Sequence, residues 1–495
     1  MMPVVEKTRK IIAVSSRKDL LCFGRKLEYP FSIILQDGTD LVCEKSLRIL
    51  PGKRLTLQGK WKDKNVVAKI FLAASGAKRH AARDYLGIKT LHTYKLNAPE
   101  ILYNGKSKCK DMHILIYEFI TSSQKVKQSW EQAKSLNEQK DLISKLAQTL
   151  ARQHTVGLWQ SDLHLNNFLL KRGKIYCLDG DGIRFRKKTK SLSLNKSFYN
   201  LAMLIEHLTN YNTEHVKTVF LEYCAYRNIP VTENYYDKLL LSMDAVRNRL
   251  NKKQMEKTLR DCSSFVCRKT NAIFQVYDRD YDVFLLKPYF DHPERFFEIS
   301  SLTYLKKGRV SSVIKVQLED FELVIKRYNI KNLLHGVKTL FKSISRARRS
   351  WLSAHYLKLL NVNTIKPVAL YESKISKLQF KSYFISEFLP AKNIVQFTMR
   401  YEHELSLLKP IADSLIMQLQ RLYTRSVTHG DLKATNILVH KNQVIFLDLD
   451  TVTWHKSQYR FERAKQEDLQ RFLRNFVHNE VLYAYWQKRI KEEFE

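Results

Sequence analysis

The same pattern of apolar positions occurs in both halves of the chain. In each half, apolar residues recur at the spacing of one helix face, and a short apolar run of strand length follows them. The helix positions are Leu142, Ile143, Leu146 and Leu150 in the first half and Ile411, Leu415, Leu419 and Leu422 in the second; the short runs are residues 175–178 and 444–447. Each half is therefore predicted to contain a helix followed by a buried strand.

Three polar residues are placed in the same way around these elements in both halves. An Asp is followed by an Asn five residues later (167 − 162, 436 − 431) and by a second Asp seventeen residues later (179 − 162, 448 − 431), directly after the apolar run. The residues are Asp162, Asn167 and Asp179 in the first half and Asp431, Asn436 and Asp448 in the second. This order is that of the catalytic loop and metal-binding Asp of kinase-like phosphotransferases.

The chemistry of phosphoryl transfer explains these residue types. Asp162 and Asp431 are placed to orient an acceptor hydroxyl and accept its proton. Carboxylate and amide oxygens suit Mg²⁺, so the Asn and the second Asp of each half are the predicted metal ligands. The sequence thus predicts ATP and Mg²⁺ as cofactors.

Each half also has a lysine in an apolar strand upstream, as a kinase requires for contact with the phosphates. Lys69 lies in Val-Val-Ala-Lys-Ile-Phe (66–71) and Lys326 in Leu-Val-Ile-Lys-Arg-Tyr (323–328). Lysine to first Asp is 93 residues in the first half (162 − 69) and 105 in the second (431 − 326). The combination in two copies makes chance a poor explanation.

Other parts of the nucleotide site are less specific. Gly52 and Gly308 precede the lysines, but neither lies in a full G-x-G-x-x-G loop, so each fits an ordinary hairpin turn as well as a phosphate loop. Glu118 and Glu387 end corresponding segments and are predicted hinge acids.

The two halves differ at the acid that should pair with the lysine. Asp84 is the candidate in the first half, unless it is a solvated helix acid. The second half has no Asp or Glu between residues 330 and 371, and Ser350 stands where the acid is expected. Either another acid serves there, or the second domain is weakly active or inactive.

Both halves resemble the bacterial lipopolysaccharide core kinases, which phosphorylate Kdo or heptose of the inner core. The segments that carry the resemblance are 48–55, 66–69, 154–157 and 161–170 in the first half, and 324–329, 345–351 and 429–432 in the second. The resemblance implies a kinase-like fold, ATP, Mg²⁺ and a sugar hydroxyl as acceptor.

We therefore expect an α+β protein with two protein-kinase-like domains in tandem, each with a strand-rich N-lobe and a compact helical C-lobe. The predicted boundaries are an N-terminal extension at 1–45, the first domain at 46–270 and the second at 285–495. Only 47 residues follow Asp448 (495 − 448), which favours a compact lobe. There, Asp468 either braces the catalytic loop or is solvated.

The charge of the chain bears on its partners. With 85 Lys and Arg against 49 Asp and Glu, the net charge is +36, so the protein is drawn to polyanions. No nucleic-acid-binding motif is recognisable, and the predicted partner is an anionic glycolipid in an anionic membrane. Two basic segments, 184–190 and the amphipathic 330–344, are candidate membrane contacts, or else a solvated loop and a packed insertion helix.

The predicted location is cytoplasmic, peripheral on the inner face of the inner membrane. The seven cysteines are scattered, and neither a signal peptide nor an apolar run of membrane length is present. The leading hypothesis is an ATP-dependent kinase of a lipopolysaccharide core sugar. The alternatives are a protein kinase, or one catalytic domain joined to a nucleotide-binding or membrane-docking pseudokinase domain.

Overall fold

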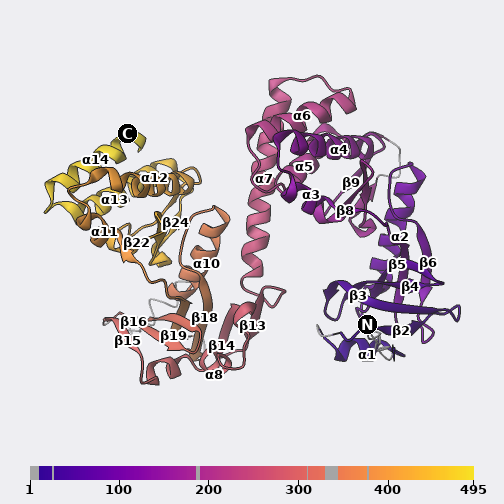
Figure 1. Ribbon diagram of the computed structural model, residues 1–495, viewed down its shortest axis with the longest axis horizontal. Coiled ribbons are helices and arrows are strands. Elements are labelled where there is room, and N and C mark those ends of the chain that lie inside the picture. Colours follow the sequence, from indigo (N-terminus) through magenta and orange to yellow (C-terminus); the bar gives the residue numbers. More distant parts are fainter. Residues whose placement is uncertain are drawn as a thin grey trace, which may run out of the picture. The chain divides into compact units, whose positions relative to one another are not determined.

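The computed structural model describes residues 11–24, 27–185, 190–308, 310–328, 344–375 and 378–494. The chain divides into two compact units, Met1–Asn248 (unit 1) and Arg249–Glu495 (unit 2). Each unit has a seven-stranded sheet followed along the chain by a mainly helical part (Figure 1). The predicted α+β class is confirmed.

The sheet of unit 1 has the strand order β1-β2-β3-β4-β5-β7-β6. Its strands are β1 (Ile12–Ala13), β2 (Phe31–Ile34), β3 (Asp40–Leu50), β4 (Arg54–Trp61), β5 (Lys64–Phe71), β6 (Ile101–Lys106) and β7 (His113–Glu118). Side chains alternate across β5: Val66, Ala68 and Ile70 are buried in the core of the sheet, which places Lys69 on the other face. Helix α2 (Ala77–Thr93) packs against β5, β6 and β7.

The helical part of unit 1 lies beyond one end of this sheet (Figure 1). It comprises α3 (Val126–Gln132), α4 (Leu136–Thr155), α5 (Leu194–Ile205), α6 (Thr213–Arg227) and most of α7 (Glu233–Lys257); α1 (Arg17–Cys22) precedes the sheet. The predicted apolar face of residues 142–150 is confirmed, because Leu142, Ile143, Leu146 and Leu150 are all buried on α4. Short strands frame the loops that follow: β8 (Gln124–Lys125), β9 (Leu158–Gln160), β10 (Phe168–Lys171), β11 (Lys174–Cys177) and β12 (Ile183–Phe185).

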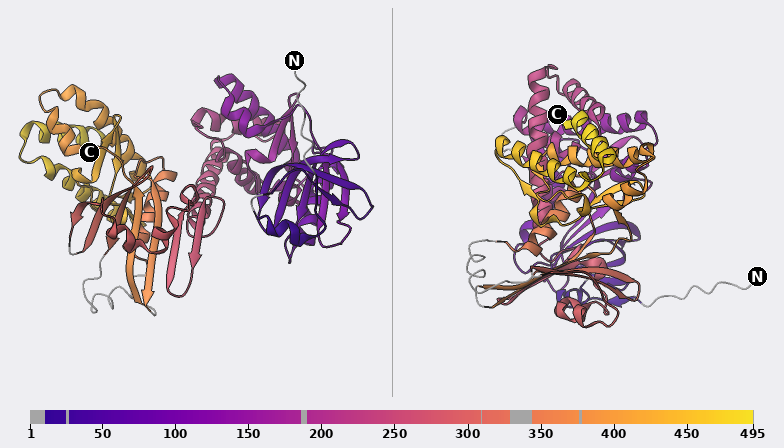
Figure 2. Two further views of the ribbon diagram at one scale, coloured as in Figure 1. Left: turned by 60° about the horizontal axis from the view of Figure 1, so that its bottom comes forward. Right: turned by 90° about the vertical axis from the view of Figure 1, so that its left-hand side faces the viewer.

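Unit 2 repeats this plan. Its sheet has the order β13-β14-β18-β19-β17-β16-β15. The strands are β13 (Phe265–Lys269), β14 (Ile273–Asp278), β15 (Thr303–Lys307), β16 (Ser311–Leu318), β17 (Phe321–Tyr328), β18 (Pro367–Ile375) and β19 (Leu378–Glu387). Helix α10 (Arg346–Leu359) packs on β17, β18 and β19, and α8 (Lys287–Asp291) lies near the opposite end of the sheet from the helical part (Figures 1 and 2).

The helical part of unit 2 is smaller. Its helices are α11 (Ile394–Arg400), α12 (Lys409–Tyr423), α13 (Gln458–Leu473) and α14 (Glu480–Phe494), with the short strands β20 (Lys392–Asn393), β21 (Val427–Thr428), β22 (Ile437–His440), β23 (Gln443–Phe446) and β24 (Thr453–Trp454). The predicted face of 411–422 is buried on α12. One hydrophobic core joins this part to α10, with Trp351 and Trp486 among its fully buried side chains.

Strand register relates the two units residue by residue. Lys69 is paired with Thr56 on β4 and Leu115 on β7. Lys326 is paired with Val313 on β16 and Phe384 on β19. In both sheets the lysine strand therefore lies between its hairpin partner and the strand that ends at the predicted hinge acid.

The units begin and end elsewhere than the sequence suggested. Residues 12–13, 31–34 and 40–45, expected in an N-terminal extension, form strands of the unit 1 sheet. Residues 265–278, placed around the end of the first domain and the linker, form β13 and β14 of the unit 2 sheet. Burial explains this, because Phe265, Phe274 and Val276 pack in the same core as Trp351.

Both candidate membrane contacts fall largely outside the described residues, which omit 186–189 and 329–343. Among the helices that are described, none combines the length and the apolar composition that crossing a bilayer requires.

Candidate active sites

The predicted catalytic loop of unit 1 lies between α4 and the strand pair β10–β11. Asn167 Nδ2 donates a hydrogen bond to the backbone oxygen of Asp162 (3.0 Å), which closes the loop on itself. The backbone N–H of Leu178 donates to the oxygen of Asn167 (2.9 Å), which holds the residue before Asp179 against the loop. The Asp162 side chain is 57% exposed. The three residues are thus brought together, with Asp162 accessible to an acceptor.

Unit 2 has the same loop. Asn436 Nδ2 donates to the backbone oxygen of Asp431 (3.0 Å), and the N–H of Leu447 donates to the oxygen of Asn436 (2.8 Å). Lys433 Nζ lies 3.2 Å from an Asp431 carboxylate oxygen. In unit 1, the side chain at the corresponding position is His164, whose Nε2 lies 4.0 Å from an Asp162 oxygen.

Helix α13 braces the loop of unit 2. The carboxylate of Asp468, which is buried, accepts hydrogen bonds from the backbone N–H groups of Gly430 (2.9 Å) and Leu432 (3.4 Å) on either side of Asp431. Of the two alternatives for Asp468, the one in which it braces the catalytic loop is therefore correct. In unit 1, Asn200 on α5 braces the segment before the loop. Its side chain accepts a hydrogen bond from the N–H of Gln160 and donates one to the backbone oxygen of Gln160.

The lysine of unit 1 is held by the helix acid. Asp84 on α2 is completely buried, and its two oxygens accept hydrogen bonds from Lys69 Nζ at 3.0 and 2.7 Å. Tyr117 Oη donates to the same carboxylate (3.0 Å), and Arg54 lies 3.8 Å from it. Asp84 is thus a buried ion-pair partner and not a solvated helix acid.

The carboxylates around Lys69 titrate differently. Burial raises the pKa of Asp84, and the charge of Lys69 opposes that shift. Burial also acts on Asp179, but there the charges of Lys69, 3.6 Å away, and Arg54 prevail and hold the pKa below its ordinary value. The Asp179 oxygen that lies 3.6 Å from Lys69 Nζ is buried and has no hydrogen bond among the described residues, so this ion pair is its polar contact there.

The lysine of unit 2 has another partner. Lys326 Nζ forms a short ion pair with Asp448, the predicted metal ligand. Asp448 adopts a left-handed backbone (φ 54°, ψ 58°), whereas Asp179 is extended (φ −114°, ψ 97°). Left-handed conformations are costly for a residue other than Gly, so surrounding contacts must hold Asp448 there. Ser350 on α10 bonds Tyr328 (3.0 Å) instead of the lysine.

A third acid in each unit was missed by the sequence reading. Asp181 and Asp450 stand two residues after the predicted metal ligands, and both pair with basic side chains of the packed helix. Asp181 lies 2.7 Å from Arg83 and 3.0 Å from His80 on α2. Asp450 lies 2.5 Å from Arg346 at the start of α10. Their identical distance from the first Asp, nineteen residues (181 − 162, 450 − 431), was the signal available in the sequence.

The predicted hinge acids occupy equivalent positions at the ends of β7 and β19, opposite Val66 and Leu323. The side chain of Glu118 accepts a hydrogen bond from the N–H of Glu100 (3.3 Å). Glu387 contacts Tyr281 and Lys366. Both carboxylates are therefore engaged with neighbouring segments of their own unit.

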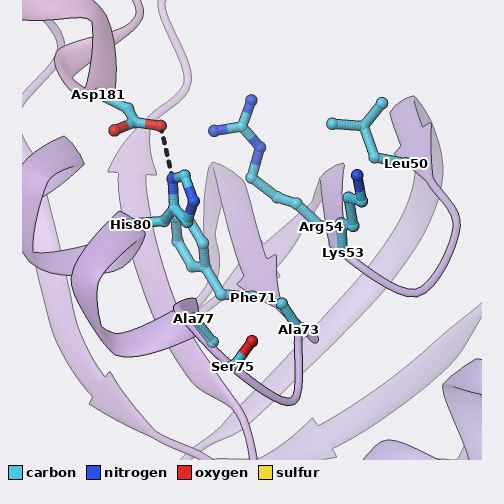
Figure 3. Close-up of a pocket in the computed structure, with 9 residues that line it drawn as sticks. All are labelled: Leu50, Lys53, Arg54, Phe71, Ala73, Ser75, Ala77, His80 and Asp181. Carbon is cyan, nitrogen blue, oxygen red and sulfur yellow. Dashed lines mark hydrogen bonds and ion pairs between the residues drawn. The ribbon is translucent and has the colours of Figure 1, made fainter.

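A cavity of about 350 Å³ is lined by Leu50, Lys53 and Arg54, which flank the turn from β3 to β4 (Figure 3). Gly52 has a φ of +68° in the tight turn from β3 to β4, and the next two residues, Lys53 and Arg54, line the cavity. His80 and Asp181 line it from the side of α2, and Phe71 lies below (Figure 3). Gly308 lies between β15 and β16 without a positive φ.

The predicted Mg²⁺ site of each unit consists of side-chain oxygen donors. The described residues contain no group of three or more His, Cys, Asp or Glu side chains arranged for a metal. The predicted Mg²⁺ ligands are of another kind, one Asn and one Asp in each unit.

The comparisons with known proteins agree with this chemistry. Residues 306–492, most of unit 2, match the family model described as "Lipopolysaccharide kinase (Kdo/WaaP) family". This match lies within unit 2 and covers less than half of the chain. The protein is therefore a phosphotransferase with a hydroxyl acceptor, and membership of a kinase family implies ATP as the donor.

Among solved structures, the chain is similar to one titled "WaaP in complex with acyl carrier protein", at 17% sequence identity. The alignment covers 42% of this chain and 88% of that one, with a TM-score of 0.32. No curated protein is detectably similar in sequence.

Proposed function

We propose that the protein is an ATP-dependent kinase of a Kdo or heptose hydroxyl in the lipopolysaccharide inner core, built from two kinase-like domains in tandem. One observation carries the proposal: the unit that matches the lipopolysaccharide kinase family closes its catalytic loop with the same hydrogen bonds as unit 1. Both units therefore hold an Asp, an Asn and a second Asp in the arrangement that phosphoryl transfer uses.

In unit 1, Asp162 orients the acceptor hydroxyl and accepts its proton. Asn167 and Asp179 would hold Mg²⁺, which would supply charge neutralisation for the phosphates. Lys69 contacts the phosphates, and its pairing with buried Asp84 fixes its position. The corresponding residues of unit 2 are Asp431, Asn436, Asp448 and Lys326.

The cavity lined by Lys53 and Arg54 provides a binding site for anionic groups in unit 1. Its upper rim bears two cations, Lys53 and Arg54, and Arg54 also lies 3.8 Å from Asp84, the partner of Lys69. Arg54 and Lys69, the lysine proposed to contact the phosphates, thus lie on the same carboxylate. We assign the cavity to the phosphate groups of the nucleotide.

The acceptor is a membrane glycolipid, so the enzyme must work at a bilayer. A net charge of +36 favours contact with an anionic surface, and each basic residue close to such a surface contributes about 1 kcal/mol. We place the protein peripherally on the inner face of the inner membrane.

A second candidate function concerns unit 2 alone. Its lysine is engaged by Asp448 and its helix carries Ser350 in place of the acid, which favours a nucleotide-binding regulatory domain. In that case unit 1 performs the whole reaction.

Mass spectrometry of core glycolipid tests both candidates. Glycolipid is taken from cells without the gene and from the same cells complemented with wild type, Asp162→Asn or Asp431→Asn. Cells without the gene are expected to lack one phosphate on the core glycolipid (~80 Da, the group transferred). If only one of the two variants restores this phosphate, the unit that is intact in that variant performs the transfer. An unchanged glycolipid in cells without the gene contradicts the proposed acceptor.

A further inference from the structure

Lys326 lacks the helix acid that positions Lys69 in unit 1. In unit 1, three groups converge on the Asp84 carboxylate: Lys69, Tyr117 and Arg54. Helix α10 has no Asp or Glu in its sequence, and Ser350, buried at the matching position, has a neutral side chain. A different arrangement must therefore connect the lysine to the helix in unit 2.

The aromatic ring of Tyr328 occupies the space between them. Tyr328 stands two residues after Lys326 on β17, so both side chains lie on the same face of the sheet. Lys326 Nζ lies 5.1 Å from the ring centroid and Arg346 Cζ lies 4.9 Å from it. A tyrosine ring attracts cations at these distances through the negative potential of its face. Its hydroxyl reaches Ser350 on α10 (3.0 Å).

An ion pair between a partly exposed arginine and a buried carboxylate completes the connection. Arg346, the first residue of α10, lies 2.5 Å from Asp450, whose side chain is 1% exposed. Asp450 is two residues beyond Asp448, so this pair ties the start of the helix directly to the segment that carries the metal ligand. The equivalent Asp181 of unit 1 is 18% exposed and pairs with two basic side chains that are about 40% exposed (41% and 42%). Arg346 is itself 39% exposed, so the units differ in the burial of the carboxylate and not of the basic side chain.

We infer that Tyr328, Arg346 and Asp450 together are the positioning residues of unit 2 and replace the lysine–acid pair. This rests on the proposed kinase function. The ring holds Lys326 without a permanent negative charge, so the lysine can leave Asp448 for the phosphates when Mg²⁺ and nucleotide bind. Unit 1 has Phe71 at the position of Tyr328, without a hydroxyl to reach the helix.

The test uses the full chain in a Lys69→Ala, Asp179→Asn background, so that nucleotide binding reports unit 2. Binding of Mg²⁺-ATP is measured by equilibrium dialysis with labelled ATP. Tyr328→Leu is expected to weaken binding about tenfold, and Tyr328→Phe, which keeps the ring, to restore most of it. Tyr304→Leu, at a half-exposed tyrosine of β15, is the matched control and should leave binding unchanged.

Turnover separates positioning from general stability. On the glycolipid acceptor, Arg346→Gln is expected to lower kcat and Tyr328→Leu to raise KM for ATP, with Arg346→Lys recovering part of kcat. If Tyr328→Leu binds ATP as well as Tyr304→Leu does, or if unit 2 binds no ATP in this background, the inference is overturned. ATP binding with the expected order of variants but without glycolipid phosphorylation would contradict the proposed function and leave the inference standing.

Discussion

The two units place the same catalytic loop next to two different lysine environments. In unit 1, Lys69 is paired with a carboxylate that is completely buried on the packed helix. In unit 2, Lys326 is paired with the predicted metal ligand Asp448, and the Tyr328 ring, 5.1 Å from the lysine, carries a hydroxyl that reaches Ser350 on the helix. The loop is set by local hydrogen bonds between nearby residues, whereas the lysine environment depends on three segments far apart in sequence. Two units with the same plan can therefore share the first and differ in the second.

The largest difference should come from the catalytic Asp residues. Asp162→Asn and Asp431→Asn each remove the proton acceptor of one unit, which costs about 10²–10⁴-fold in turnover where that unit is active. Steady-state phosphorylation of purified core glycolipid measures it. If the units act independently on the same acceptor, only the double variant loses all activity; if one unit is regulatory, a single variant suffices.

The next effect concerns the folding of unit 1. Asp84→Ala leaves Lys69 buried without its partner, and breaking a buried pair in this way costs about 3–5 kcal/mol. Chemical denaturation followed by tryptophan fluorescence gives the change in the free energy of unfolding. The matched substitution in unit 2, Ser350→Ala, removes only a hydrogen bond between neutral groups and should cost about 1 kcal/mol. Equal costs would remove the distinction between the two lysine environments.

An acid placed on α10 sharpens the comparison further. Ser350→Asp offers Lys326 a helix carboxylate like that of unit 1, which should draw the lysine away from Asp448 and change the affinity of unit 2 for Mg²⁺-ATP about fivefold. Ser353→Asp introduces the same charge at another buried serine of the same helix and serves as the control. The same response from both variants would mean that a buried charge, and not its pairing with Lys326, produces the effect.

The pH dependence of unfolding should report Asp179. Its pKa in the folded state lies below the ordinary 3.8, because the charges of Lys69 and Arg54 outweigh burial. Asp179 therefore contributes stability that is fully present above pH 3.8 and is lost as the pH falls through the lower folded-state pKa. Asp179→Asn should flatten the acid limb of the unfolding free energy measured by circular dichroism. An unchanged limb would show that other carboxylates dominate it.

The smallest effect separates the two predicted glycine turns. Gly52→Ala strains a residue at φ +68° and should destabilise unit 1 by about 1 kcal/mol, although no atom obstructs the new methyl group. Gly308→Ala meets no such backbone restriction, but its methyl group would lie 3.0 Å from the oxygen of Ser311, which a slight shift relieves. Thermal unfolding of the two variants compares them, and equal shifts would argue against a special turn at Gly52.

Several features were accessible to sequence analysis because they depend on local chemistry. The helix faces of 142–150 and 411–422 follow from periodicity, and the D-x-x-x-x-N loops follow from spacing. The roles of the site residues stay predictions that the experiments above address. Asp181 and Asp450 went unnoticed because their partners, on α2 and α10, lie about 100 residues away in sequence (181 − 83, 450 − 346).

The sequence by itself determined the repeated order of lysine, Asp, Asn and Asp, the missing acid on α10 and the strong positive charge, since these are properties of residue identity and spacing. Only the tertiary structure decided that Asp84 is buried against Lys69, that Asp448 takes the left-handed conformation beside Lys326, and that Tyr328 lies beneath two cations. It also decided that residues 265–278 complete the second sheet. The physical reason is that burial and charge pairing depend on which distant segments pack together, and packing is a property of the whole fold.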